Sequence, residues 1–133
     1  MASITQSDAA ARVAVGLARS REIGVDMNIA IVDREGLLVQ FSRMDNAWLG
    51  SIDIAQRKAR TAVYFRMPTG DLGALSQPGG PLYGIEHSNG GLITFPGGRP
   101  ITNGDGQVIG GVGVSGGTVE QDATVAEAVT SAS

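Results

Sequence analysis

The glycines of this chain are concentrated in one stretch: fourteen of the twenty lie between Gly79 and Gly117. With 20 glycines in 133 residues, the overall share is about twice the usual one of roughly 7 %. Glycine permits backbone conformations that other residues avoid, but it weakens the interior of helices and strands. We therefore expect this stretch to form turns, loops and closely packed strands, and to contain the functional site.

Length and composition predict a single packed domain over residues 1–133. Hydrophobic residues make up 42 % of the chain and charged residues 17 %, which is typical of a globular protein. The net charge is −3, and the ten basic residues form no stripe that would neutralise phosphates. We expect no nucleic-acid partner.

The absence of cysteine removes disulfides, thiolate nucleophiles and sulfur ligation of metals. The N-terminal residues show no basic leader followed by a continuous apolar block, and charged residues interrupt the apolar runs. We expect a soluble, cytoplasmic protein without a membrane partner. Removal of a signal peptide that preceded this sequence stays open.

Apolar periodicity divides the chain into helices and strands. Helical patterns cover residues 6–22, 51–67, 69–75 and 118 to the end, and strand patterns cover 25–33, 37–43, 91–95 and 107–115. Residues 96–101 form a turn that leads into a further short strand. The order is α-β-β-α-α-β-β-β-α. Because short turns join consecutive strands, we predict an α+β fold with a mainly antiparallel five-stranded sheet flanked by helices.

The only histidine, His87, lies in a predicted loop over residues 76–91, beside Glu86 and shortly after Tyr83. Such a loop is long enough to be functional or mobile. His87 is either a bystander in a turn, an acid–base group oriented by Glu86, or an axial haem ligand. The neighbouring acidic residues show no recognisable metal-ligand spacing.

Arg43 and Asp45 stand just after a predicted strand, next to Met44 and Trp48. Arg43 and Asp45 either form a surface ion pair or face a ligand. Ligand sites combine apolar walls with a few placed polar groups. We therefore keep Arg43, Asp45 and Trp48 as candidate binding residues, and Tyr83 as a further wall of the same pocket.

Lys58 shares a face of the second predicted helix with Ala55 and Ala62. Its side chain either extends past the helix edge into solvent or receives a ligand carboxylate in the space that the alanines leave. Thr61, one turn further on, is placed to hydrogen-bond the same group.

The run GGVGVSGG, residues 110–117, lies partly inside a predicted strand, so it does not fit a dinucleotide-binding turn between strand and helix. Its glycines fit a buried strand that admits a neighbouring backbone or a ligand. Ser115 and Gly116 also precede the last predicted helix, whose free amides favour an anion. We keep both as candidate binding residues.

Four segments together resemble the GlcG/haem-binding protein family, HbpS-like, which includes the C-terminal domain of PduO-type proteins. They are RMDNAW, AQRKARTAVYF, FPGGRPI and VIGGVGVSGGTVEQD, and the resemblance covers roughly residues 5 to 130. It implies a profilin-like domain that assembles into homo-oligomers, dimers or larger, with ligand sites near subunit contacts. Some members bind or help degrade haem, and others are small-molecule enzymes, including a lyase for hydroxylamino-aromatic acids.

The resemblance leaves the haem ligand open, because haem-binding relatives share no single axial ligand. A histidine that one relative uses in its N-terminal segment has no counterpart in residues 4–22. If haem is the cofactor, His87 is the one imidazole that could ligate its iron.

Three functions follow as hypotheses. The first is a small-molecule-binding protein of this family that takes haem. The second is a cofactor-independent lyase, isomerase or hydrolase for a small carboxylated aromatic or oxygenated substrate, in which His87 and Glu86 move protons and Arg43 or Lys58 holds the carboxylate. The third is an oligomeric scaffold or regulatory subunit.

Overall fold

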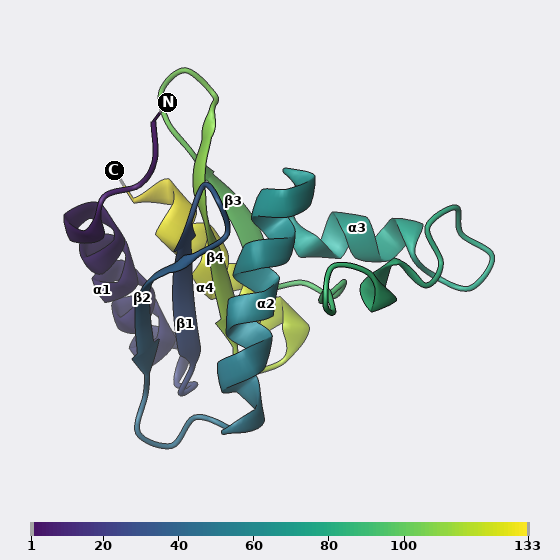
Figure 1. Cartoon of the computed structure of the whole chain (residues 1–133). Helices are drawn as coiled ribbons and strands as arrows, with labels where there is room; N and C mark the ends of the chain where they lie inside the picture. The colour runs from purple at the N-terminus through teal and green to yellow at the C-terminus, as the bar shows by residue number, and fades with distance from the viewer. Residues whose placement is uncertain (1, 133) are drawn as a thin grey trace.

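A computed structural model describes residues 2–132, which form an α+β domain around one antiparallel sheet. The elements, in chain order, are α1 (Gln6–Ile23), β1 (Asn28–Asp33), β2 (Leu38–Arg43), α2 (Gly50–Phe65), α3 (Thr69–Leu75), the 3-10 turn η1 (Ile85–His87), β3 (Gly98–Thr102), β4 (Val108–Ser115) and α4 (Val119–Ser131). The strands lie in the order β2-β1-β4-β3 (Figure 1). All three neighbouring pairs are antiparallel.

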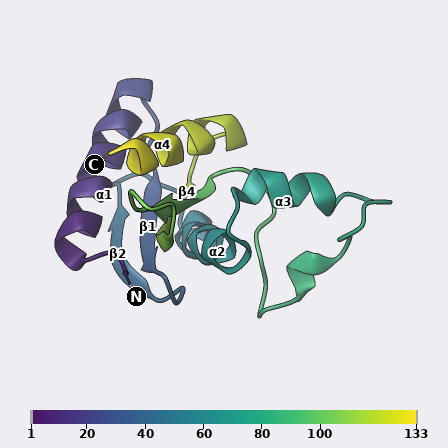
Figure 2. The ribbon, with the colours of Figure 1, turned by 90° about the horizontal axis from the view of Figure 1, so that it is seen from above.

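Helices cover both faces of this sheet. Seen from above, α1 and α4 lie on one side and α2 on the other (Figure 2). The strand residues alternate accordingly: Ile29 and Ile31 join the core with α1 and α4, whereas Ala30 and Val32 pack with α2. Each face of β1 is therefore buried, which explains its nearly continuous apolar sequence.

Helix α2 packs unusually close to β4, because both surfaces carry small residues. A Cβ atom added at Gly111 would lie 2.7 Å from the carbonyl oxygen of Ala59, and one added at Gly113 would collide with the carbonyl oxygen of Ala55. The strand glycines thus admit a neighbouring backbone, which was one of the two readings of their pattern. The small-residue face of α2 serves the same contact.

Local capping residues set both ends of α1 and the start of α4. The Thr5 side chain accepts a hydrogen bond from the Asp8 amide, and Gly24 ends α1 in the left-handed conformation. Thr118 and Gln121 form a complete capping box at the start of α4.

The predicted strand over residues 91–95 is wrong, so the sheet described here has four strands instead of five. The backbone amides of this segment bond elsewhere: that of Ile93 donates to the Thr61 hydroxyl at 3.2 Å, and that of Leu92 to the carbonyl of Glu86 at 2.9 Å. With these amides engaged by α2 and by its own loop, the segment has no strand ladder to join. The profilin-like class stays a prediction.

Residues 69–94 form a projection that we call the arm. It contains α3 and η1 and extends away from the sheet in both views (Figures 1 and 2). Leu72 and Leu92 are buried, at 1 % and 4 % exposure, whereas Leu82 and Tyr83 are exposed at 36 % and 68 %.

Among residues 2–132, no helix has the length and apolar character that crossing a membrane requires.

Candidate functional site

The structure divides the ten candidate residues among three places. Tyr83, Glu86 and His87 lie in the arm; Arg43, Asp45, Trp48, Ser115 and Gly116 gather at one end of the sheet; Lys58 and Thr61 lie inside, on α2. They therefore do not form one pocket within a single chain.

Backbone hydrogen bonds hold His87 in a defined turn of the arm. Its amide donates to the Gly84 carbonyl at 3.1 Å, and the Ser88 amide donates to the Ile85 carbonyl at 2.9 Å. Gly84 adopts φ 88°, a conformation that favours glycine. The imidazole itself is exposed and has no hydrogen-bond or ion-pair partner within residues 2–132. It is thus presented to solvent on an ordered support.

Glu86 does not orient His87 in this structure. Its Oε2 atom accepts a hydrogen bond from the Thr94 hydroxyl at 3.2 Å, which joins the outgoing and returning segments of the arm. Its carbonyl meanwhile accepts from the Leu92 amide. Glu86 therefore fastens the arm, and its predicted part in proton transfer stays a prediction.

Two arginines that the sequence patterns did not single out anchor the tip of the returning segment to α2. Arg57 donates to the carbonyls of Gly90 and Gly91 at 2.5 and 3.1 Å. Arg60 donates to the carbonyls of Gly91 and Asn89 at 2.8 and 3.3 Å. Their spacing of three residues puts both arginines on one helix face. This spacing is the feature of the sequence that could have identified them as a pair.

Removing one of these contacts should loosen the arm. Arg57→Gln removes charge-assisted hydrogen bonds to two carbonyls, so we expect chymotrypsin to cleave after Leu82 or Tyr83 several-fold faster than in the wild type. Limited proteolysis followed by mass spectrometry measures this. Arg21→Gln, on the exposed end of α1, is the matched control; equal cleavage rates in the two variants would contradict the anchoring role.

The cluster at the end of the sheet is built around Asn28, another residue that the sequence patterns did not single out. Asn28 pairs in register with Arg43 on one side and with Ser115 on the other. Its amide group donates to the Trp48 carbonyl at 3.0 Å, while its Oδ1 is buried without a hydrogen-bond partner among the described residues. The Ser115 hydroxyl donates to the Ser51 hydroxyl at 3.0 Å.

Two further candidates at this end, Asp45 and Trp48, are accessible. Asp45 is exposed, and Trp48 is 67 % exposed. Gly116 has φ 150° and lies beside the Asp26 and Met27 backbone, so it also serves a close backbone approach. The cluster therefore combines an exposed rim with a buried polar interior, and binding by these residues stays a prediction.

Lys58 is enclosed in the protein and does not reach solvent. Its ammonium donates to Asp122 at 2.9 Å and to the Val114 carbonyl at 2.8 Å, and both side chains of the ion pair are almost completely buried. The Phe95 ring covers the ammonium, with its centroid at 5.0 Å. A Cβ atom at Gly97 would lie 2.5 Å from the ammonium nitrogen, which explains why this turn carries glycine.

Burial sets the titration of this pair. Loss of solvent lowers the pKa of Lys58 below its ordinary value, against the opposing attraction of Asp122. Loss of solvent likewise raises the pKa of Asp122, against the attraction of Lys58 and the hydrogen bond from the Gly117 amide. Lys58 thus joins α2 to α4, and its predicted contact with a ligand carboxylate stays a prediction.

Thr61 also has an internal role. Its hydroxyl donates to the Arg57 carbonyl at 2.7 Å and accepts from the Ile93 amide at 3.2 Å. With 1 % exposure, it attaches the base of the arm to α2.

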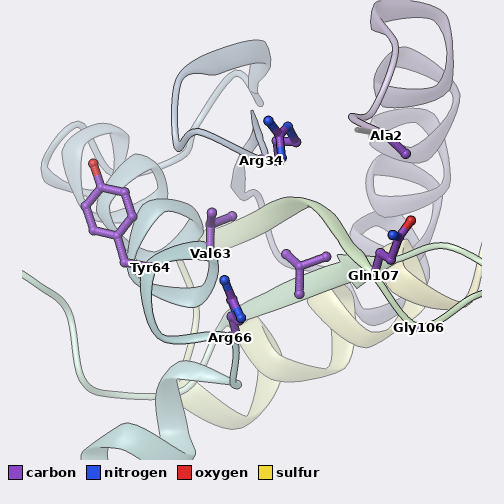
Figure 3. A pocket seen from close by; sticks show the side chains of 8 residues that line it. Ala2, Arg34, Val63, Tyr64, Arg66, Gly106 and Gln107 are labelled. Carbon is purple, nitrogen blue, oxygen red and sulfur yellow. The ribbon is translucent and has the colours of Figure 1, made fainter.

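A cavity lies apart from all these residues, where the C-terminal end of α2 meets the β1–β2 and β3–β4 turns (Figure 3). Its volume is about 390 Å³, within the range of small-molecule sites. Its lining residues are Ala2, Arg34, Val63, Tyr64, Arg66, Gly106, Gln107 and Val108. Sequence patterns did not find it, because four segments that are distant in the sequence contribute the lining.

Comparison with known proteins identifies one family that spans almost the whole chain. The family described as haem degrading protein HbpS-like matches residues 4–131. A 15.0 kDa protein from the dhaT-dhaS intergenic region of Citrobacter freundii is 41 % identical over 128 residues, which cover 96 % of this chain and 89 % of that protein. The resemblance noted in the sequence is thereby confirmed.

Solved structures agree with this assignment. Klebsiella pneumoniae ORFY, of family DUF336, has a TM-score of 0.94 and 38 % identity, covering 98 % of this chain and 90 % of that one. The complex of PduOC with haem has a TM-score of 0.91 and 36 % identity, covering 96 % and 93 %. The α+β fold is thus shared with a protein crystallised with haem.

Proposed function

Because this chain belongs to the HbpS-like family of haem-degrading proteins, we propose that it binds haem, with His87 as an axial ligand of the iron. The observation that carries the choice of ligand is the exposed imidazole of His87, which has no protein partner within the described residues. A related structure of PduOC contains haem, which supports the choice of cofactor.

The residues of the arm fit this role. A neutral imidazole nitrogen is a common haem ligand, and a ligand held by an ordered backbone loses little conformational entropy when it binds. Exposed Tyr83 and Leu82 supply apolar surface for a porphyrin near His87 in the sequence. Haem, once bound, supplies a redox-active iron.

The arm of one chain is an open surface, so we also propose that haem lies where two copies of this protein meet. The exposed apolar side chains of the arm and the projection of the arm away from the sheet (Figure 1) support this arrangement. Native mass spectrometry with and without hemin tests it: we expect a dimer or larger assembly that takes up haem. A monomer that binds haem stoichiometrically would contradict it.

Titration with hemin, followed by absorption in the Soret region, tests the ligand. We expect saturable binding by the wild type and loss of the Soret shift in His87→Ala, because the substitution removes the only imidazole of the chain. An unchanged spectrum and affinity in His87→Ala would exclude His87 as the ligand.

A matched variant separates ligation from loss of the arm surface. Tyr83→Phe keeps the aromatic ring and removes the phenol, which is itself a known type of haem ligand. We expect this variant to titrate like the wild type. Loss of the Soret shift in Tyr83→Phe but not in His87→Ala would assign the iron to Tyr83 and overturn the proposal for His87.

A further inference from the structure

We propose that the cavity lined by Arg34 and Arg66 is a second binding site, separate from the arm, for a small organic anion that carries a carboxylate or phosphate group. It lies between the C-terminal end of α2 and the two turns that join β1 to β2 and β3 to β4 (Figure 3). None of its lining residues belongs to the arm. The inference is therefore independent of haem binding.

The charge of the side chains that line the cavity favours an anionic ligand. Among the lining residues that the structure describes, the two guanidinium groups are the only charged side chains, although the chain as a whole has a net charge of −3. The C-terminal end of α2 adds roughly half a negative charge, which two full positive charges outweigh. Arginine is the residue best suited to carboxylate and phosphate, because its planar donors can bind two oxygens at once.

The backbone of Arg66 adopts a conformation that is uncommon for arginine. Arg66 follows α2 with φ 55° and ψ 42°, in the left-handed region. Glycine and asparagine are preferred at this position, and other residues adopt it at an energetic cost. Strained residues of this kind cluster at ligand sites. An arginine here is explained if its guanidinium is needed in the cavity.

The two arginines differ in the partners that they have within the protein. Within residues 2–132 the Arg66 guanidinium has no hydrogen-bond, ion-pair or ring partner. Arg34 pairs with the exposed Glu35 at 3.3 Å, and an exposed pair of this kind contributes little energy. An anionic ligand would give Arg66 the partner it lacks, whereas Arg34 already has partners in the protein.

The walls of the cavity indicate the rest of the ligand. Val63 and Val108 supply apolar surface, and Gln107 supplies a polar group. At about 390 Å³ the cavity exceeds the space that one inorganic ion occupies. We infer a ligand with one anionic group and a short carbon skeleton.

Isothermal titration of the full chain with inorganic phosphate, and separately with acetate, tests the anion site and distinguishes the two chemistries. We expect saturable binding of at least one probe that weakens as salt is raised. Arg66→Asn should weaken that binding about tenfold or more, which corresponds to the loss of a charged hydrogen bond. Asparagine suits the left-handed backbone, so the fold should persist, as thermal unfolding will verify.

Two controls make the outcome decisive. Arg21→Asn removes an exposed positive charge outside the cavity and should leave affinity unchanged, whereas Arg34→Gln should weaken it. Absence of saturable binding for both probes, or equal affinity in the wild type and Arg66→Asn, would overturn the proposal. Hemin titration of Arg66→Asn should match the wild type, so that failure of this site and failure of haem binding are told apart.

Discussion

Replacing Gly113 by alanine should destabilise this protein by about 3 kcal/mol or more, at or beyond the upper end of the usual cost of overpacking. The added methyl group would collide with the Ala55 carbonyl oxygen and approach the Ala59 amide nitrogen to 2.6 Å. Both are backbone atoms of α2, so no side chain can rotate away. Urea unfolding followed by far-ultraviolet circular dichroism measures the change in the free energy of unfolding.

Gly104→Ala is the matched control for this prediction. Gly104 lies in the turn between β3 and β4, where an added Cβ would meet no atom within 4 Å. We expect a change within about 0.5 kcal/mol, as for surface substitutions generally. If Gly113→Ala were as stable as Gly104→Ala, the close approach of α2 to β4 would not be required by the fold.

The second large effect concerns the buried ion pair of Lys58 and Asp122. Lys58→Met leaves the Asp122 carboxylate in the interior without its cation, and Asp122→Asn leaves the Lys58 ammonium without its anion. Removal of one partner of a buried pair costs about 3–5 kcal/mol. Both single variants should therefore show this loss in urea unfolding.

The double variant Lys58→Met/Asp122→Leu should be more stable than either single variant. It leaves no unpaired buried charge, and apolar replacement of a buried pair is often close to neutral. Glu22→Gln, which breaks the exposed pair with Arg19, is the control and should change stability by less than about 1 kcal/mol. Additive losses in the double variant would show that the two side chains do not depend on each other.

The amino-acid sequence predicted most of the fold because its signals were local. The capping box of Thr118 and Gln121 and the stop at Gly24 were readable within a few residues. The strand patterns over residues 25–33 and 107–115 likewise predicted strands that the structure contains, β1 and β4. The prediction of a strand over residues 91–95 was wrong. An apolar run is equally compatible with a strand and with an extended segment whose amides bond to side chains and loops.

The candidate site was predicted less completely. Sequence reasoning found His87 and its loop, since the only imidazole of a chain is conspicuous. It placed Lys58 on the correct face of its helix, but it could not show that Asp122, 64 residues away, encloses it. It did not find Arg66 as a cavity residue, because neither the left-handed backbone nor the convergence of distant turns has a local signature.

By itself, the sequence determined the helices, the antiparallel strands and the family, through periodicity, capping residues and motifs that act over short distances. Only the tertiary structure decided what Gly111, Gly113 and the alanines of α2 are for: they let α2 approach β4, and Lys58 is buried at this contact. Contacts between distant segments depend on complementary surfaces, and a single position in a sequence does not reveal which surface it will meet.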